Sequence, residues 1–435
     1  MKLQNEKTRQ AVVLIHGMGE QRPMDNLRSF VQSIRSNLVN SDISEKNTKI
    51  RSKPDHISEI YETRRLSLSA SRYRPVTDFY EFYWAQNMRD SKMSQFLNWF
   101  WKLIFTKPNK IPSRLIPIWW AFWCGLGILS LSIFYLSVII NFHEILTAYS
   151  TFILLPTFVS IFFVVLKKSF LNTVGDAGRY FTPTPENVLE RSKIRAQGIS
   201  FLKKLHERNG ENKYDRIIVV GHSLGSVIAY DLLSILWTEF NETNCNPSTI
   251  NQRSIDEIEK VIKNKTKQIN SKEFSKLQYK CWLEQKSVGN KWLISDLITI
   301  GSPLSSVDYL MVNNVSIKDL INQREFPICP PISDERNSKI HYLTKQYNVG
   351  TEKRKLKILH HAAVFAVTRW TNIYYSSDFI GGPVSRIFGQ GVRDIEIKKK
   401  SYFFYPSGHT MYWNMKNIES LKKITKALKL RFDNN

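Results

Sequence analysis

Short apolar runs alternate with amphipathic stretches along most of the chain. The apolar runs predict strands at Ala11–Ile15, Glu59–Leu66, Asp78–Tyr83, Arg216–Val220, Leu293–Ile300, Thr371–Tyr375 and Asp394–Ile397. Apolar residues at helical spacing predict helices at Met24–Leu38, Pro185–Glu207, Ser226–Phe240 and Asn417–Leu430, with a further stretch near His360–Thr368. This alternation is typical of an α/β fold, with a mostly parallel central sheet and helices on both of its faces.

Two long apolar segments interrupt the alternation. No charged residue occurs in Leu115–Phe142, and after His143 and Glu144 the segment Ile145–Leu166 is again uncharged. At 1.5 Å per residue the second segment reaches about 33 Å as a helix, enough for a hydrocarbon layer of about 30 Å. We therefore expect a transmembrane helical hairpin at 111–168, although an apolar cap domain or a dimer interface fits the same pattern.

Basic residues flank these apolar segments on both sides. They are Lys102, Lys107, Lys110 and Arg114 before the first segment, and Lys167 and Lys168 after the second. Basic residues next to membrane helices favour the cytoplasmic side, so we expect both outer ends of the hairpin, and the rest of the chain, to be cytoplasmic.

The hairpin divides the expected fold into parts. Residues 1–110 would form the first part of the α/β domain, 111–168 the hairpin, and 169–435 the second part. Polar segments at about 241–289 and 317–357 are inserted into the second part, where they form either a cap over a site or surface loops.

The charge is strongly positive, with 62 basic and 38 acidic residues and a formal net charge of +24. Such a charge suits an anionic membrane surface or a nucleic acid, although a chain rich in Lys, Asn and Ile also acquires it through compositional bias. Since no nucleic-acid-binding motif occurs, we expect membrane lipids, and no nucleic acid, as partners. The four cysteines form no CxxC pair, so neither a zinc site nor a disulfide framework is expected.

The first chemical signal is Gly221-His222-Ser223-Leu224-Gly225, which lies between an apolar strand and an apolar helix. In that context G-x-S-x-G predicts a nucleophile elbow, where Ser223 occupies a tight turn at a helix N-terminus. Gly221 and Gly225 remove the Cβ atoms that would block the crossing of strand and helix.

A second segment, His16-Gly17-Met18-Gly19, ends the first predicted strand. A loop in this place supplies part of the oxyanion hole in such elbows, so the backbone N–H groups of Met18 and Leu224 are the expected donors. His16 is more simply explained as a polar residue that braces the loop.

The order of a triad on this fold is serine, then acid, then histidine. The histidines after Ser223 are His341, His360, His361 and His409. His409 follows the last predicted strand and a glycine-containing loop, so it is the expected base.

Asp378 is the expected acid, because it closely follows the apolar strand Thr371–Tyr375 and precedes a Gly-Gly turn. Asp394 and Glu396 are the alternatives, but both lie within or at the start of the last predicted strand.

Together HGMGEQ, GHSLGS, DLITIGSPLS, WTNIYYSSDFIGG and SGHTMYW resemble the lipase- and esterase-like branch of the α/β-hydrolase superfamily. The chain is similar to bacterial hydrolases with an HGxGEQ start over residues 10–90 and 175–430. The resemblance implies Ser223 as nucleophile, Asp378 as acid, His409 as base, and Met18 and Leu224 as oxyanion donors, with no metal or cofactor. A membrane hairpin departs from most soluble members.

We therefore expect a serine hydrolase that cleaves lipid acyl esters, anchored in the inner membrane of a bacterium with its catalytic domain in the cytoplasm. A thioesterase or protein deacylase would use the same residues. The alternative that is not an enzyme is an inactive membrane-anchored scaffold of the same fold.

Overall fold

The structure of the protein is a computed structural model. It describes residues 8–431 except 18–21, 55–56, 59, 88–100, 102, 114, 140–156, 158–179, 181–184, 209, 211–212, 242–250, 265–267, 311–315, 334–338, 350 and 399–408. The chain divides into a larger unit (Met1–Met88, Thr184–Asp308 and Asn313–Asn435) and a smaller unit (Arg89–Pro183 and Tyr309–Val312).

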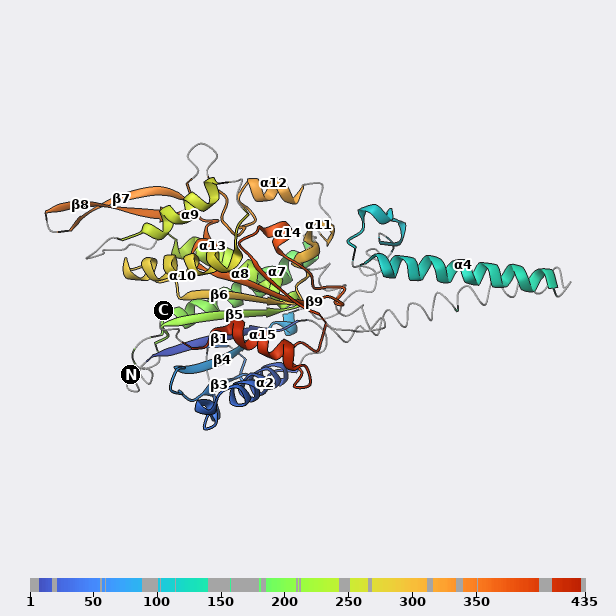
Figure 1. The fold of residues 1–435 in the computed structure, drawn as a ribbon, viewed down its shortest axis with the longest axis horizontal. Coiled ribbons are helices and arrows are strands. Elements are labelled where there is room, and N and C mark those ends of the chain that lie inside the picture. Colours follow the sequence, from blue (N-terminus) through green and yellow to red (C-terminus); the bar gives the residue numbers. More distant parts are fainter. Residues whose placement is uncertain are drawn as a thin grey trace. The chain divides into compact units, whose positions relative to one another are not determined.

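An eight-stranded sheet lies at the centre of the larger unit, in the strand order β10-β9-β6-β5-β1-β4-β3-β2 (Figure 1). The strands are β1 (Arg9–Ile15), β2 (Ile50–Pro54), β3 (Arg64–Leu68), β4 (Val76–Phe82), β5 (Arg216–His222), β6 (Ile294–Ile300), β9 (Arg369–Tyr375) and β10 (Arg393–Ile397). The strands from β10 to β4 run parallel, whereas β3 and β2 pair antiparallel at one edge. The sheet is therefore mostly parallel, as expected.

Helices cover both faces of this sheet (Figure 1). The long ones in the larger unit are α2 (Asp25–Ser41), α7 (Pro185–His206), α8 (Leu224–Phe240), α9 (Arg253–Lys263), α10 (Ser271–Ser287) and α15 (Ile418–Leu428). Helices α2 and α15 pack on one face, where Phe30 and Ile424 join apolar side chains of β1, β5 and β6 in one buried cluster. This arrangement is an α/β fold.

The shorter elements complete the description. They are α11 (Val307–Leu310), α12 (Ile317–Asn322), α13 (Val364–Val367), α14 (Ser385–Phe388), the hairpin strands β7 (His341–Val349) and β8 (Glu352–Leu359), and the 3-10 turns η1 (Ile43–Glu45), η2 (Ala85–Asn87), η3 (Pro108–Lys110) and η6 (Pro303–Ser306).

The two polar segments contain helices and strands, not loops alone. The described part of 241–289 contains α9 and α10, and that of 317–357 contains α12, β7 and most of β8. The helix expected at His360–Thr368 is wrong in extent, because only the four residues of α13 are helical and His360 and His361 precede them.

The smaller unit contains α4 (Ile116–Ile139), which accounts for most of the first long apolar segment. Trp119 and Trp123 at its start both donate their indole N–H groups to the carbonyl oxygen of Ile104, at 2.9 and 3.2 Å. All but one residue of the second apolar segment lie outside the described residues. Across the described part of the chain, no helix has the length and hydropathy of a membrane span, so the expected pair of spanning helices is not found there.

Candidate active site

A sharp turn joins β5 to α8 and places Ser223 at its corner. Ser223 has φ 52° and ψ −129°, which side-chain-bearing residues rarely adopt. A Cβ atom at Gly221 would lie 2.4 Å from the Cα of Ser226, and one at Gly225 would lie 2.1 Å from the carbonyl oxygen of Ile15. Only glycine fits at these two positions, so the spacing of the G-x-S-x-G segment follows directly from the packing.

The structure brings Ser223, His409 and Asp378 together in one hydrogen-bonded chain. The Nε2 of His409 lies 2.8 Å from the Oγ of Ser223, and its Nδ1 lies 2.9 Å from the Oδ2 of Asp378. All three side chains are buried. Since a carboxylate only accepts, Nδ1 carries the proton, and Nε2 is then free to accept the hydroxyl proton of Ser223.

The surroundings of Asp378 stabilise its charged form. Burial alone would raise the pKa of this carboxyl, but the nearby imidazole of His409 and several hydrogen bonds outweigh it, and the pKa falls to about 2. The hydroxyl of Tyr412 donates to Oδ2 at 2.6 Å, and the N–H of Ile380 donates to Oδ1 at 2.9 Å. Asp378 therefore stays a carboxylate at neutral pH.

The backbone of His409 is held by the residue next to Ser223. The Nε2–H of His222 donates to the carbonyl oxygen of His409 at 2.9 Å, and the His222 ring packs against Trp413 with 4.9 Å between centroids. Burial, together with the proximity of His409, lowers the pKa of His222 to about 3. His222 is thus a neutral donor that fixes the position of the expected base.

The end of β1 lies against the elbow. A Cβ atom at Gly17 would lie 2.8 Å from that of Ser223, so this backbone passes directly beside Ser223. Leu224 is the first residue of α8, and its N–H belongs to the helix N-terminus that favours negative charge. Met18 and Gly19 lie outside the described residues, and the expected contribution of Met18 stays a prediction.

His16 braces this loop, as its position in the sequence suggests. Its Nδ1–H donates to the carbonyl oxygen of Gly17 at 2.7 Å, and its ring stacks on Trp84 with 5.3 Å between centroids. Trp84 in turn donates its indole N–H to the carbonyl oxygen of His16 at 3.0 Å. Burial lowers the pKa of His16 to about 4, so the ring is neutral at neutral pH.

The alternative acid Asp394 is engaged elsewhere. Its carboxylate accepts from the side-chain amide of Asn372 at 2.6 Å and from the backbone N–H groups of Val384 and Ser385 at 3.1 and 3.0 Å. It therefore anchors the chain around α14.

The sequence pattern does not predict two hydrogen bonds of the site: the one from Tyr412 to Asp378 and the one from His222 to the backbone of His409. The signals that could have pointed to them are that Tyr412 is close in sequence to His409 and that His222 is next to Ser223.

Among the described residues, no group of three or more His, Cys, Asp or Glu side chains is placed to hold a metal ion. No protein-family model, curated protein or solved structure matches the chain.

Proposed function

We propose that the protein is a serine hydrolase of the α/β-hydrolase type that cleaves carboxylic esters. The observation that carries this proposal is the hydrogen-bonded chain from Ser223 through His409 to Asp378, with the serine at the N-terminus of α8. A serine, a histidine and a carboxylate in this order are the groups needed for nucleophilic acyl transfer.

In the first half of the reaction, Nε2 of His409 takes the hydroxyl proton as Oγ of Ser223 attacks the ester carbonyl carbon. The N–H of Leu224 and the loop that follows Gly17 would stabilise the oxyanion that forms. The carbon–oxygen bond to the alcohol then breaks, and His409 returns the proton to the leaving alcohol.

In the second half, water attacks the acyl-enzyme while His409 accepts a proton from it, and the carboxylic acid is released from Ser223. Throughout, Asp378 holds the imidazole in the required tautomer and stabilises its cationic form. The reaction requires no cofactor.

Membrane lipids are the substrate class that we propose. In α4, large apolar side chains are exposed, including Leu131 at 69% and Phe134 at 68%. Exposed apolar surface of this kind favours contact with a bilayer, and the net charge of +24 favours anionic headgroups. An enzyme held at a cytoplasmic membrane surface meets acyl esters at a high local concentration.

The test is release of fatty acid from phospholipid vesicles and from p-nitrophenyl esters by the purified full-length protein. Ser223→Ala should lose the activity almost completely, since removal of such a nucleophile costs on the order of a millionfold in kcat. Ser234→Ala is the matched control, because its hydroxyl donates to the carbonyl oxygen of Tyr230 in its own helix, and it should retain the rate within about twofold. Ester hydrolysis that persists in Ser223→Ala would refute the proposal.

A further inference from the structure

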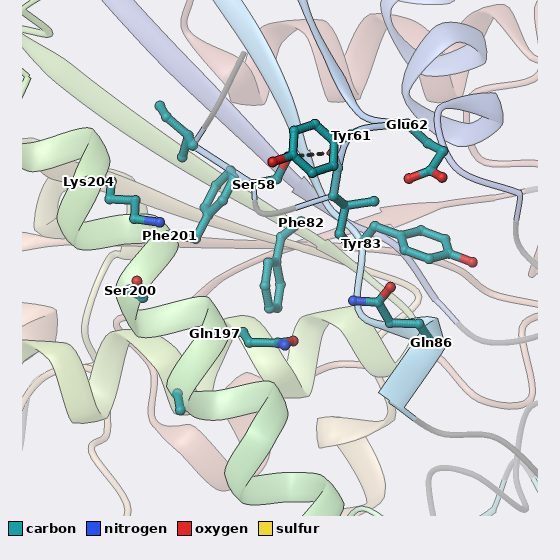
Figure 2. Close-up of a pocket in the computed structure, with 13 residues that line it drawn as sticks. Ser58, Tyr61, Glu62, Phe82, Tyr83, Gln86, Gln197, Ser200, Phe201 and Lys204 are labelled. Atoms are coloured by element: carbon teal, nitrogen blue, oxygen red, sulfur yellow. Dashed lines mark hydrogen bonds between the residues drawn. The ribbon is translucent and has the colours of Figure 1, made fainter. Parts of the chain in front are cut away.

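A cavity of about 540 Å³ lies in the larger unit, between α7, the end of β4 and the segment that precedes β3 (Figure 2). Its volume is in the range of ordinary ligand sites. The residues that line it are Ile57, Ser58, Ile60, Tyr61, Glu62, Phe82, Tyr83, Gln86, Ala196, Gln197, Ser200, Phe201 and Lys204. None of them belongs to the catalytic groups described above.

The floor of the cavity is apolar and its rim is mostly polar. Phe82, Phe201 and Ile57 are buried, and the two phenyl rings pack with 5.8 Å between centroids. Figure 2 shows these rings between α7 on one side and Tyr61 and Tyr83 on the other. The exposed lining residues include the polar side chains of Glu62, Gln86 and Gln197 as well as Tyr61 and Ala196. An occupant would therefore bury an apolar part against the floor.

The sheet places this cavity close to Ser223. Phe82, at the end of β4, is in register with Ile15 of β1, and Ile15 is in register with Gly221 of β5. Neighbouring strands lie about 4.8 Å apart, so Phe82 is about 10 Å across the sheet from Gly221, two residues before the nucleophile.

One pair of aromatic rings connects the cavity with the end of β1, beside Ser223. Tyr83 lines the cavity, and its ring lies 5.2 Å from that of His16. Gly17, the next residue, is the one whose backbone passes beside Ser223. Because His16 is neutral at neutral pH, this wall presents no charge to an apolar group that extends from Ser223 toward the cavity.

From this placement we infer that the cavity is the acyl-chain subsite, which binds the apolar tail of a medium- or long-chain acyl group while its carbonyl carbon lies at Ser223. The inference rests on the proposed function. It assigns Phe82, Phe201 and Ile57 to chain recognition, and it predicts a preference for long over short acyl groups.

Binding of sodium dodecanoate to Ser223→Ala protein, measured by calorimetry, tests the subsite without turnover. Ala196 is exposed on α7 and lines the cavity, so a tryptophan there fills the space without disturbing the core. Adding Ala196→Trp should weaken dodecanoate binding at least about tenfold, whereas adding Ala196→Ser should leave it within about twofold. Equal binding by both double variants, or no binding to Ser223→Ala, would overturn the inference.

A second readout separates this inference from the proposed function. In protein with an intact serine, Ala196→Trp should reduce kcat/KM for p-nitrophenyl dodecanoate at least about tenfold more than for p-nitrophenyl acetate. An equal reduction for both esters would overturn the subsite. A protein that binds dodecanoate as expected but hydrolyses neither ester would instead refute the proposed function.

Discussion

Ser223 is held in a backbone conformation that costs on the order of 1–3 kcal/mol. Two contacts keep it there: its N–H donates to the carbonyl oxygen of Ile300 at 2.9 Å, and its own carbonyl oxygen accepts the N–H of Ser226 at 2.9 Å. The conformation directs Oγ toward His409 rather than into the helix. Strain at this residue is therefore part of how the site is built.

The hydrogen bond from His222 to the backbone of His409 can be tested by substitution. His222→Phe should lower kcat by about tenfold to a hundredfold with little change in KM, since the backbone of His409 loses its donor and a shift of about 1 Å suffices for such a loss. His222→Gln should recover most of the rate, because its side-chain amide can donate to the same carbonyl. Steady-state kinetics on a p-nitrophenyl ester measure both, and equal rates in the two variants would argue against a positioning role.

Part of the site was predictable from sequence and part was not. Ser223 and Asp378 follow apolar strands whose carboxyl ends must meet at one edge of a parallel sheet, so their proximity follows from the pattern. The bonds that Tyr412 and His222 make depend on how the chain near His409 approaches the elbow. No local pattern encodes that approach.

At the level of elements, the elbow depends on how closely α8 approaches β1. The start of α8 lies so near the carbonyl oxygen of Ile15 that position 225 has no room for a side chain. Sheet and helix are thereby fixed at the distance that places Ser223 beside Gly17.

Gly225→Ala should therefore destabilise the fold by about 3 kcal/mol or more, because the new Cβ meets backbone atoms that cannot move aside. Denaturant unfolding measures the change. Gly127→Ala in α4 is the matched control, since a Cβ atom there meets nothing within 4 Å. Equal stability of the two variants would contradict this account of the elbow.

The start of α2 is tied to the end of β4 by a buried carboxyl. Burial raises the pKa of Glu81 to about 7, with a further contribution from Asp25, although the N–H of Met24 donates to its Oε2 at 2.6 Å and opposes the rise. Its Oε1 has no hydrogen-bond partner among the described residues. The ionised form is therefore unfavourable in the folded state.

The contribution of Glu81 to the stability of the protein should consequently fall as the pH rises. A folded pKa of about 7 against 4.5 in the unfolded chain means that the stabilisation is complete below pH 4.5 and is lost as the pH passes 7. The loss is about 3 kcal/mol. Glu81→Gln should raise the free energy of unfolding by about this amount at pH 8.5, and by little at pH 5. Denaturant unfolding at both pH values checks the sign, and an equal effect at both would disprove it.

Strands differ in how well their pattern predicts them. The buried strands β1 and β5 contain continuous apolar runs, Ala11–Ile15 and Ile217–Val220, and β6 is apolar apart from Ser295, Asp296 and Thr299, as is typical of strands covered on both faces. In contrast, β2 (Ile50–Pro54) lies at the sheet edge and is exposed after its first residue, so its polar sequence gave no signal. The polar strands β7 and β8 were missed for a related reason: they pair only with each other.

At the scale of the whole molecule, the two units carry different chemistry. The larger unit contains the triad, and the smaller unit contains the uncharged helix α4 with exposed apolar side chains. The sequence pattern correctly predicts that this helix is apolar. Contact between the helix and a bilayer also depends on what surrounds the helix, which the sequence pattern does not specify.

The membrane proposal predicts that the protein floats with anionic phospholipid vesicles in a density gradient. Ile128→Asn combined with Leu131→Asn should reduce the bound fraction several-fold, since both side chains are exposed on α4. Ile43→Asn combined with Ile418→Asn alters two exposed apolar residues of the larger unit and should leave binding unchanged. Equal flotation of both double variants would contradict the role of α4.

The most direct test of the central claim is covalent labelling with a fluorophosphonate, followed by peptide mass spectrometry of the folded, full-length protein. The account predicts that the label attaches to Ser223, and that His409→Ala reduces the labelling rate by at least about a hundredfold, because the hydroxyl then lacks its proton acceptor. An unlabelled Ser223, or a rate that does not depend on His409, would contradict it.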